Sequence, residues 1–271
     1  MKLKCVNIIK TDNRGMNMSD KNKIDVCGVC FDNVTASQAR ERLFSALDAS
    51  SGSLFLFTPN PEIVMLAEED KEFSDILNSD ALVVPDGIGV IKAANILKTP
   101  LRERVPGIEL GEAMIEYCAK KGSVLPVYLL GGKEGVASLA AEKLCEKYEG
   151  LCVCGTHNGY FDASGEDNDA LINEINEKKP ALVLVCLGAP KQEKWIYKNA
   201  DKLPTVRVFA GLGGSLDVFS GNVKRAPAFF CKCGLEWFYR LLSQPTRIKR
   251  MCKLPLFLIK AKKHAKRTKN A

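Results

Sequence analysis

The sequence lacks the features that mark several familiar classes of protein. No apolar run approaches the roughly 20 residues of a transmembrane helix, so a polytopic membrane protein is excluded. The N-terminus begins with basic residues but has no apolar stretch of signal-peptide length. Neither the dinucleotide fingerprint G-x-G-x-x-G nor the P-loop GxxxxGK[ST] occurs, which disfavours an NAD-dependent oxidoreductase and a P-loop kinase. There are only two histidines, so we expect no metal ion and no cofactor.

Cysteine is abundant, but its pattern is not that of a secreted or zinc-binding protein. The count of 11 is odd, so we expect small buried side chains in a reducing cytoplasm. Cys27 and Cys30 have the spacing of a redox motif, yet they fall in a predicted strand. A redox pair needs a helix N-terminus to lower the thiol pKa, so this role is disfavoured. Cys152/Cys154 and Cys231/Cys233 are too closely spaced for typical zinc ligands.

Charge is distributed very unevenly along the 271 residues. The net charge is +7, but residues 222–271 carry 14 Lys and Arg against the single Glu236, a balance of +13. The first 221 residues therefore have a balance of −6. Hydrophobic residues make up 46% of the chain, which is enough for a substantial core. We expect a folded acidic body whose basic tail meets an anionic partner.

The order of apolar and amphipathic segments predicts an α/β fold. Residues 1–22 read as a flexible N-terminus, in which Met16 and Met18 are alternative starts. Buried strands are predicted at 24–29, 54–58, 81–85, 127–130, 151–154, 181–187 and 206–211. Helices are predicted near 36–49, 61–78, 87–98, 107–121, 134–148, 166–178 and 190–199, the first with a Thr35/Gln38 capping box. This alternation predicts a mainly parallel, Rossmann-like sheet with helices on both faces, over residues 23–221. We expect two sub-halves, about 23–122 and 123–221.

Residues 222–271 are predicted to form a basic helical appendage. Helical segments are expected at 227–243 and 245–264, with Pro245 between them. The run Leu254–Ile259 is apolar and lies among lysines, as in segments that lie on an anionic membrane surface. The alternatives are a solvated basic tail and a tail that packs on the body. Because all predicted strands come earlier, we expect the body to stay folded after truncation before Pro227.

Polar residues follow the predicted strands, at the sheet edge where α/β proteins bind ligands. In the first half these are Thr58, Asn60 and Asp86, followed by two guanidinium groups at Arg102 and Arg104. Asp86 precedes a glycine-rich helix start, so a helix N-cap is the alternative to a functional carboxylate. In the second half the strand ends are followed by a Gly-Gly-Lys-Glu-Gly loop that resembles phosphate-binding loops, and by Tyr160, Gln192 and Asp217.

Six short sequence motifs, most of which contain the residues named above, occur along the chain in an order typical of one family. They are TPNPEIV, PDGIGV, RVPGIEL, LGAPKQEKWI, GLGGSLDVFSGNVKRAP and LEWFYRLLSQPTRIKRM. Over about residues 24–255 the chain resembles the WecG/TagA/CpsF glycosyltransferases. The resemblance implies an inverting, metal-independent transfer of a sugar from a UDP-sugar to a sugar on undecaprenyl diphosphate. It also implies peripheral attachment to the cytoplasmic face of the cell membrane. The expected reaction moves N-acetylmannosamine onto N-acetylglucosamine-diphospho-undecaprenol, in wall teichoic acid or related surface polysaccharide synthesis.

The resemblance also implies roles for individual residues. Asp86 is expected to be the general base, and Thr58 and Asn60 to line its pocket. Arg104 is expected to hold phosphate, Gln192 and Tyr160 to contact substrate, and Asp217 to bind the uridine. The expected stabilisers of the UDP leaving group are Arg240, Arg247 and Arg250, because guanidinium groups match phosphate oxygens.

Two alternatives remain open at this stage. The same fold could use another UDP-sugar, either N-acetylmannosamine uronic acid or glucose, for exopolysaccharide or capsule synthesis. A non-enzymatic protein could use the basic tail to bind anionic lipid or nucleic acid. Nucleic acid is the less expected partner, because the tail has few aromatic residues beyond Trp237, Phe238 and Tyr239, which read as helix-packing residues.

Overall fold

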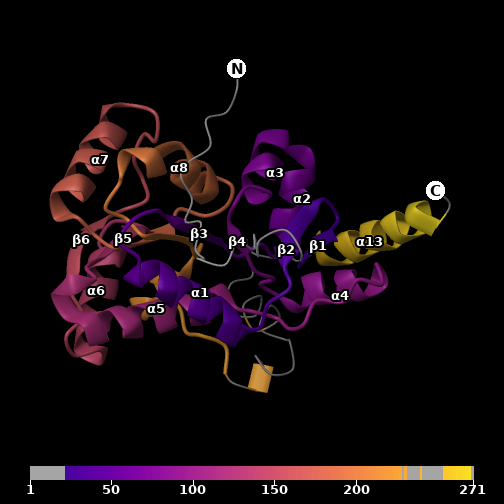
Figure 1. The fold of residues 1–271 in the computed structure, drawn as a ribbon, viewed down its shortest axis with the longest axis horizontal. Helices are drawn as coiled ribbons and strands as arrows, with labels where there is room; N and C mark the ends of the chain where they lie inside the picture. The colour runs from indigo at the N-terminus through magenta and orange to yellow at the C-terminus, as the bar shows by residue number, and fades with distance from the viewer. Residues whose placement is uncertain (1–21, 228, 231–238, 240–252, 270–271) are drawn as a thin grey trace.

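The computed structural model describes residues 22–227, 229–230, 239 and 253–269. Its centre is a six-stranded sheet with helices on both faces (Figure 1). The strand order is β4-β3-β8-β7-β5-β6, and all neighbouring strands are parallel. The strands are β3 (Leu54–Phe57), β4 (Leu82–Val83), β5 (Val127–Gly131), β6 (Val153–His157), β7 (Leu182–Cys186) and β8 (Val208–Gly211). The prediction of a parallel sheet is confirmed.

Each face of the sheet has its own hydrophobic core, because side chains alternate along the strands. Phe55, Phe57 and Phe209 point to one face, where they pack on five helices of the body. These helices are α2 (Pro61–Glu69), α3 (Lys71–Leu77), α4 (Ile88–Ile96), α7 (Glu166–Lys178) and α8 (Lys191–Asn199). Leu56 and Ala210 point to the other face. It is covered by α1 (Ala36–Asp48), α5 (Gly107–Lys121), α6 (Val136–Lys147) and α9 (Ser215–Phe219).

Two predicted elements differ from the structure. The strand predicted at 24–29 is wrong, because β1 (Lys23–Val26) and β2 (Val29–Asp32) form an antiparallel hairpin. Cys27 and Gly28 make its turn, both with positive φ. The helix predicted at 61–78 breaks at Asp70, whose side chain accepts a hydrogen bond from the Phe73 N–H and so caps α3.

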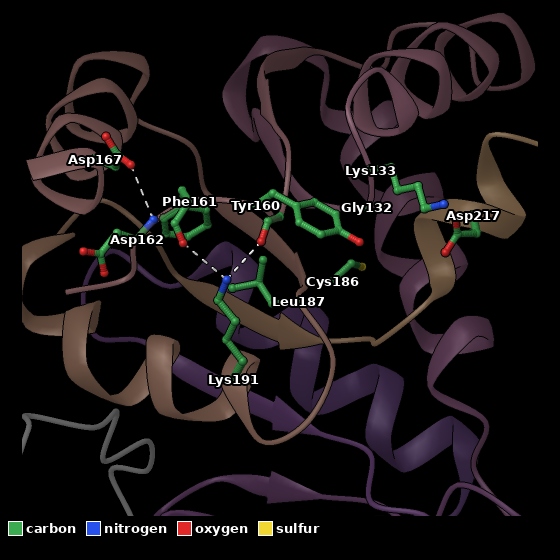
Figure 2. Close-up of a pocket in the computed structure, with 11 residues that line it drawn as sticks. Gly132, Lys133, Tyr160, Phe161, Asp162, Asp167, Cys186, Leu187, Lys191 and Asp217 are labelled. Atoms are coloured by element: carbon green, nitrogen blue, oxygen red, sulfur yellow. Dashed lines mark hydrogen bonds between the residues drawn. The ribbon is translucent and has the colours of Figure 1, made fainter. Parts of the chain in front are cut away.

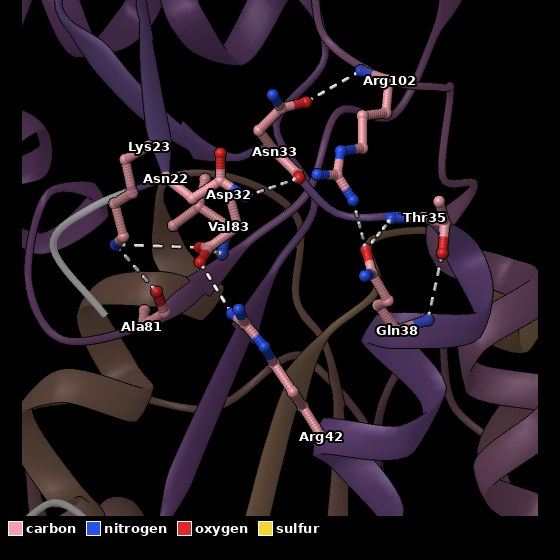
Figure 3. A network of polar contacts seen from close by, with 10 residues as sticks. All are labelled: Asn22, Lys23, Asp32, Asn33, Thr35, Gln38, Arg42, Ala81, Val83 and Arg102. Carbon is pink, nitrogen blue, oxygen red and sulfur yellow. Dashed lines mark hydrogen bonds and ion pairs between the residues drawn. The ribbon is translucent and has the colours of Figure 1, made fainter. Parts of the chain in front are cut away.

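The hairpin is attached to the sheet through Asp32, a buried carboxylate (Figure 3). Its oxygens accept hydrogen bonds from Arg42 of α1 at 2.9 Å and from the Val83 N–H at 3.0 Å. The predicted capping box of α1 is confirmed, since Thr35 accepts from the Gln38 N–H and the Gln38 side chain accepts from the Thr35 N–H. The hairpin, α1 and the edge of the sheet therefore form one connected unit.

The C-terminal helix α13 (Lys253–Lys269) packs across α4 and α2. Phe257 and Ala261 are fully buried in the same core as the sheet aromatics. Gly89 permits this packing, because a Cβ there would lie 2.6 Å from the Leu254 Cδ1 atom. Lys260 also forms an ion pair with Glu68 of α2 at 2.6 Å. The helix therefore completes the core, against the expectation that the body is complete without residues beyond 227.

No helix in the described part of the chain is long and apolar enough to cross a bilayer.

Candidate active site

The sheet opens two crevices at its carboxyl edge. After β3 the chain enters α2 on one face, whereas after the neighbouring β8 it enters α9 on the opposite face. The same divergence occurs between β5, which leads to α6, and β7, which leads to α8. Ligands of open α/β sheets bind where neighbouring strands diverge in this way. Each of the two crevices holds a cavity.

The larger cavity lies between β5 and β7 and has a volume of about 690 Å³ (Figure 2). Its lining includes Cys186, the last residue of β7, and Gly132 and Leu187, which directly follow β5 and β7. Charged side chains stand around it at Lys133, Asp162, Asp167, Lys191 and Asp217. Because both signs of charge are present, this wide cavity suits a ligand that carries phosphate as well as hydroxyl or imide donors.

Tyr160 belongs to a loop that is held firmly at the side of the wide cavity. Its ring is 74% exposed and lies over the opening (Figure 2). The Gly159 N–H donates to the Gly132 carbonyl at 2.8 Å, and Asn158 donates to Glu134 at 2.6 Å. An exposed aromatic ring on an anchored loop offers a flat apolar surface for stacking at little cost in conformational entropy.

Lys191 stabilises the same loop from α8. Its Nζ atom donates to the Gly159 carbonyl at 3.0 Å and lies 4.8 Å from the centre of the Phe161 ring. The ammonium group therefore neutralises carbonyl dipoles of the loop and makes a cation–π contact. In this structure Lys191 therefore helps to hold in place the loop that carries Tyr160.

The smaller pocket lies between β3 and β8 and has a volume of about 50 Å³. Thr58 and Asp86 line it together with the start of α5 at Gly107 and the start of α9 at Ser215. Gly107 is required there, because a Cβ would come within 2.8 Å of the Thr58 side chain. Thr58 is oriented by a hydrogen bond from its Oγ1 to the Gly211 carbonyl at 3.3 Å. This small pocket can hold one reacting group beside a carboxylate.

The Asp86 loop is fixed by its backbone. The Asp86 N–H donates to the Pro59 carbonyl at 3.2 Å, and the Val105 N–H donates to the Pro85 carbonyl at 3.0 Å. The second bond brings the segment of Arg104 beside the segment of Asp86. Helix α4 has Gly87 as its N-cap and no side-chain capping bond, so the structure does not show Asp86 as the cap. The carboxylate is instead part of the pocket lining.

The predicted site residues fall into distinct places. Thr58 and Asp86 share the small pocket, whereas Tyr160 and Asp217 share the wide cavity. Helix α9 joins the two, because its Ser215 lines one and its Asp217 the other. Asn60 caps α2, accepting from the Ile63 N–H at 3.0 Å.

Gln192, Arg102 and Arg104 do not line either cavity. Gln192 is 2% exposed and lines neither cavity, so its contact with a sugar stays a prediction. Of the two guanidinium groups near α5, Arg102 is engaged at α1, where it donates to Gln38 at 3.1 Å. The contact of Arg104 with phosphate stays a prediction. The predicted leaving-group residues Arg240, Arg247 and Arg250 lie outside the described residues.

Sequence reasoning missed the acidic side of the wide cavity. Asp167 and Asp169 are separated by one residue, a spacing that allows two carboxylates to hold the metal ion of a bound nucleotide. Here only Asp167 lines the cavity, while the Asp169 side chain is 74% exposed and lies 4.0 Å from Lys202. Within the described ranges, no three His, Cys, Asp or Glu side chains are grouped as metal ligands.

The two thiols of the hairpin, Cys27 and Cys30, do not have the lowered pKa of a redox-active pair. Burial raises the pKa of the Cys27 thiol to about 11, and it also raises the pKa of Cys30. A reactive cysteine needs the opposite shift, because the thiolate is the nucleophile. Both thiols are protonated at neutral pH.

Comparison with known proteins finds a matching family and similar sequences. The model of the glycosyl transferase WecG/TagA/CpsF family matches residues 24–271. The chain is 37% identical over 256 residues to proteins of Staphylococcus aureus strains MRSA252 and MW2. Both relatives are named N-acetylglucosaminyldiphosphoundecaprenol N-acetyl-beta-D-mannosaminyltransferase. Each match covers 93% of this chain and 97% of the relative.

Proposed function

The chain belongs to the WecG/TagA/CpsF family of glycosyl transferases, and on that premise we propose that it transfers N-acetylmannosamine from UDP-N-acetylmannosamine to N-acetylglucosamine-diphospho-undecaprenol. The observation that carries the proposal is the 37% identity over nearly the full length of relatives named for this transfer. The product would serve wall teichoic acid or a related surface polysaccharide.

The wide cavity is our candidate for the UDP site. A uracil ring can stack on Tyr160, and the Asp217 carboxylate can accept hydrogen bonds from ribose hydroxyls or from the uracil imide. The small pocket then takes the acceptor hydroxyl, beside Thr58 and near Asn60. The sugar would lie over α9, because this helix contributes to both cavities.

Asp86 acts as the general base in this proposal. An inverting transfer needs one carboxylate to accept the proton of the acceptor hydroxyl as that oxygen bonds to the sugar. The departing UDP gains negative charge, which Arg104 and the C-terminal Arg240, Arg247 and Arg250 would stabilise without a metal ion. These guanidinium groups would stabilise the negative charge that develops on the UDP oxygens in the transition state.

We further propose that the basic appendage, residues 222–271, associates with the cytoplasmic face of the membrane. Opposite the buried Phe257, helix α13 exposes Leu256 and Ile259 by 53% and 50%. Lys263 and Lys266 continue the same helical stripe, and both are exposed. Apolar side chains next to lysines favour an anionic interface, where each basic residue contributes about 1 kcal/mol.

A donor panel tests the reaction. The enzyme is incubated with a short-chain N-acetylglucosamine-diphospho-lipid and UDP-N-acetylmannosamine, its uronic acid or UDP-glucose, and products are identified by mass. We expect rapid transfer from UDP-N-acetylmannosamine only. Preferred transfer from either other donor would contradict the proposed substrate while leaving a glycosyl transferase.

Vesicle sedimentation tests the membrane proposal. The double substitution Leu256→Ser/Ile259→Ser should reduce binding to anionic vesicles several-fold without lowering thermal stability, because both side chains face outward. Val124→Ser is the matched control, since Val124 is 69% exposed on the body. Equal loss of binding in the control, or undiminished binding in the double variant, would contradict this surface.

A further inference from the structure

Three consecutive residues at the start of α8 hold the walls of both cavities. Lys191 anchors the Tyr160 loop, as described above. The next residue, Gln192, is buried, and its Oε1 accepts a hydrogen bond from the Gly213 N–H at 2.9 Å. The third residue, Glu193, is 1% exposed, and its Oε1 accepts from the Gln192 Nε2 at 2.8 Å. A chain of two hydrogen bonds therefore runs from Glu193 to the backbone of Gly213.

Gly213 lies in the segment that the two cavities share. It connects β8 to α9 and has a φ of +56°, a conformation that glycine tolerates best. The following Gly214 and Ser215 line the small pocket, and Asp217 lines the wide cavity. A shift of the Gly213 peptide would therefore displace side chains in both places.

The burial of the Glu193 carboxyl group is unfavourable for the stability of the fold. Its second oxygen, Oε2, has no hydrogen-bond partner among the described residues. Burial of a carboxyl group without full pairing is unfavourable, and it raises the pKa of Glu193 to about 7. An apolar side chain would fill the same space at lower cost. What the carboxyl offers instead is an acceptor for the Gln192 amide.

The orientation of Gln192 depends on that acceptor. A glutamine amide accepts at one end and donates at the other. Gly213 needs the accepting end, because a backbone N–H only donates. With an acceptor at position 193, the NH₂ end is satisfied in the same orientation. Without one, the NH₂ group is buried and unpaired, so only the Gly213 N–H still favours this orientation and the amide is held less firmly.

We propose that Glu193 is a positioning residue for glycosyl transfer, which orients Gln192 so that Gly213 holds the wall shared by the two cavities. It touches neither cavity and acts only through Gln192. The inference rests on the proposed function only where transferase turnover is the readout.

Two substitutions separate the acceptor from the bulk of the side chain. Glu193→Gln keeps an oxygen that can accept from Gln192, whereas Glu193→Met keeps the size and removes the acceptor. We expect Glu193→Gln to stay within about 3-fold of the original kcat/KM. Glu193→Met should lose about 10-fold or more, mostly in kcat, because small displacements of reacting groups are costly. Rescue by glutamine is the result that a space-filling role would not produce.

Hydrogen exchange of the 211–216 segment reports on the Gly213 N–H directly. Exchange should be slow in the unsubstituted protein and in Glu193→Gln, and fast in Glu193→Met and Gln192→Met. The double variant Gln192→Met/Glu193→Met should exchange no faster than either single variant, because all three interrupt the same pair of hydrogen bonds. This readout needs no sugar donor. Failure of the unsubstituted enzyme to transfer N-acetylmannosamine would therefore count against the proposed function and leave this test intact.

Asn199→Ala is the matched control on the same helix. Asn199 is fully buried, accepts from Asn168 at 3.2 Å and donates to the Trp195 carbonyl at 2.9 Å, and none of the three lines either cavity. It should lower thermal stability and leave both kcat/KM and the exchange of 211–216 unchanged. If Glu193→Met behaves like this control, the positioning role is wrong.

A substitution at Gly211, which packs against the Gln192 side chain, tests the proposal if Glu193→Met does not fold. In Gly211→Ala the new Cβ would lie 3.1 Å from the Gln192 Nε2 and push the amide from its place. The proposal predicts faster exchange at 211–216 and a reduced kcat in this variant. Unchanged exchange and turnover would overturn it.

Discussion

The wide cavity and the small pocket have the same topological origin, yet they differ in volume and in the charge of their lining. Both lie where neighbouring parallel strands send the chain to opposite faces of the sheet. The wide cavity is about 690 Å³, and charged side chains surround it. The small pocket is about 50 Å³, and its lining is mostly apolar or uncharged, with the single carboxylate of Asp86.

The difference suggests a division of labour. A nucleotide needs volume, a flat ring and several polar partners, which the first cavity offers. Proton transfer needs one carboxylate within hydrogen-bond reach of one hydroxyl, and a larger space would only admit water. Helix α9 and the Gly213 segment join the two. Substitutions in the small pocket should therefore change kcat, whereas substitutions in the wide cavity should change the affinity for UDP.

The largest effect is expected from Asp86→Asn. This change keeps the size of the side chain and removes its basicity, so kcat should fall by about 10²–10⁴-fold. Binding of UDP, measured by titration calorimetry, should stay within about 2-fold because the nucleotide cavity is separate. Asp75→Asn on the surface of α3 is the control. An Asp86→Asn enzyme with near-original turnover would remove the general base from the small pocket.

The next largest effect concerns the shared wall and the stability of the fold. The pKa of Glu193 is raised to about 7 in the folded protein by burial, so the folded state keeps a proton that the unfolded chain loses near its ordinary pKa of 4.5. Stability from this group is therefore lost as pH rises from about 4.5 to 7, by about 3 kcal/mol. Denaturant titrations at several pH values should show this loss in the original protein. In Glu193→Gln the loss of stability between pH 4.5 and 7 should be smaller by the same amount. An equal loss in both proteins would contradict the raised pKa of Glu193.

A smaller effect is expected in the wide cavity. Tyr160→Ala removes the stacking surface and Asp217→Asn removes the acceptor charge, so each should weaken UDP binding by about 10-fold, or about 1.4 kcal/mol. At saturating donor, kcat should change by less than about 3-fold. Tyr160→Phe keeps the ring and should bind UDP nearly as well as the original. If Asp217→Asn instead lowers kcat with unchanged UDP affinity, Asp217 takes part in the chemistry and the two cavities are not separate in function.

The smallest effect is expected from chelation. Only Asp167 of the Asp167/Asp169 pair faces the wide cavity, and the proposed leaving-group partners are arginines. Activity should therefore change by less than about 2-fold in EDTA. Full inactivation, restored by Mg²⁺ or Mn²⁺, would show that the acidic side of the wide cavity holds a metal ion. Asp167→Asn should then reproduce the loss.

Much of the fold could be predicted because the strands are short, apolar and separated by helix-period segments. The positions of Thr58 and Asp86 at strand ends also follow from that pattern. The hairpin was missed, because the Cys27 φ of 56° is unusual for a residue other than glycine and gives no turn signal. The break at Asp70 was missed because the same residue both ends one helix and caps the next.

The division of the site residues between two cavities could not be predicted. It depends on the strand order, which places β8 between β3 and β7 although it comes last in the chain. The burial of Gln192 depends on the close approach of Gly211 and Gly213, a tertiary contact without a local signature. For the same reason the sequence favours a membrane surface for the apolar run near the C-terminus and leaves packing on the body as an alternative, whereas Phe257 belongs to the core.

The most direct test of the division of labour is a crystal structure of the Asp86→Asn variant with intact UDP-N-acetylmannosamine. Slow turnover in this variant should preserve the donor during crystallisation. The account predicts uracil against Tyr160 in the wide cavity, ribose or base within hydrogen-bond distance of Asp217, and the anomeric carbon facing residue 86 across α9. A nucleotide bound in another place, or a sugar directed away from residue 86, would contradict it.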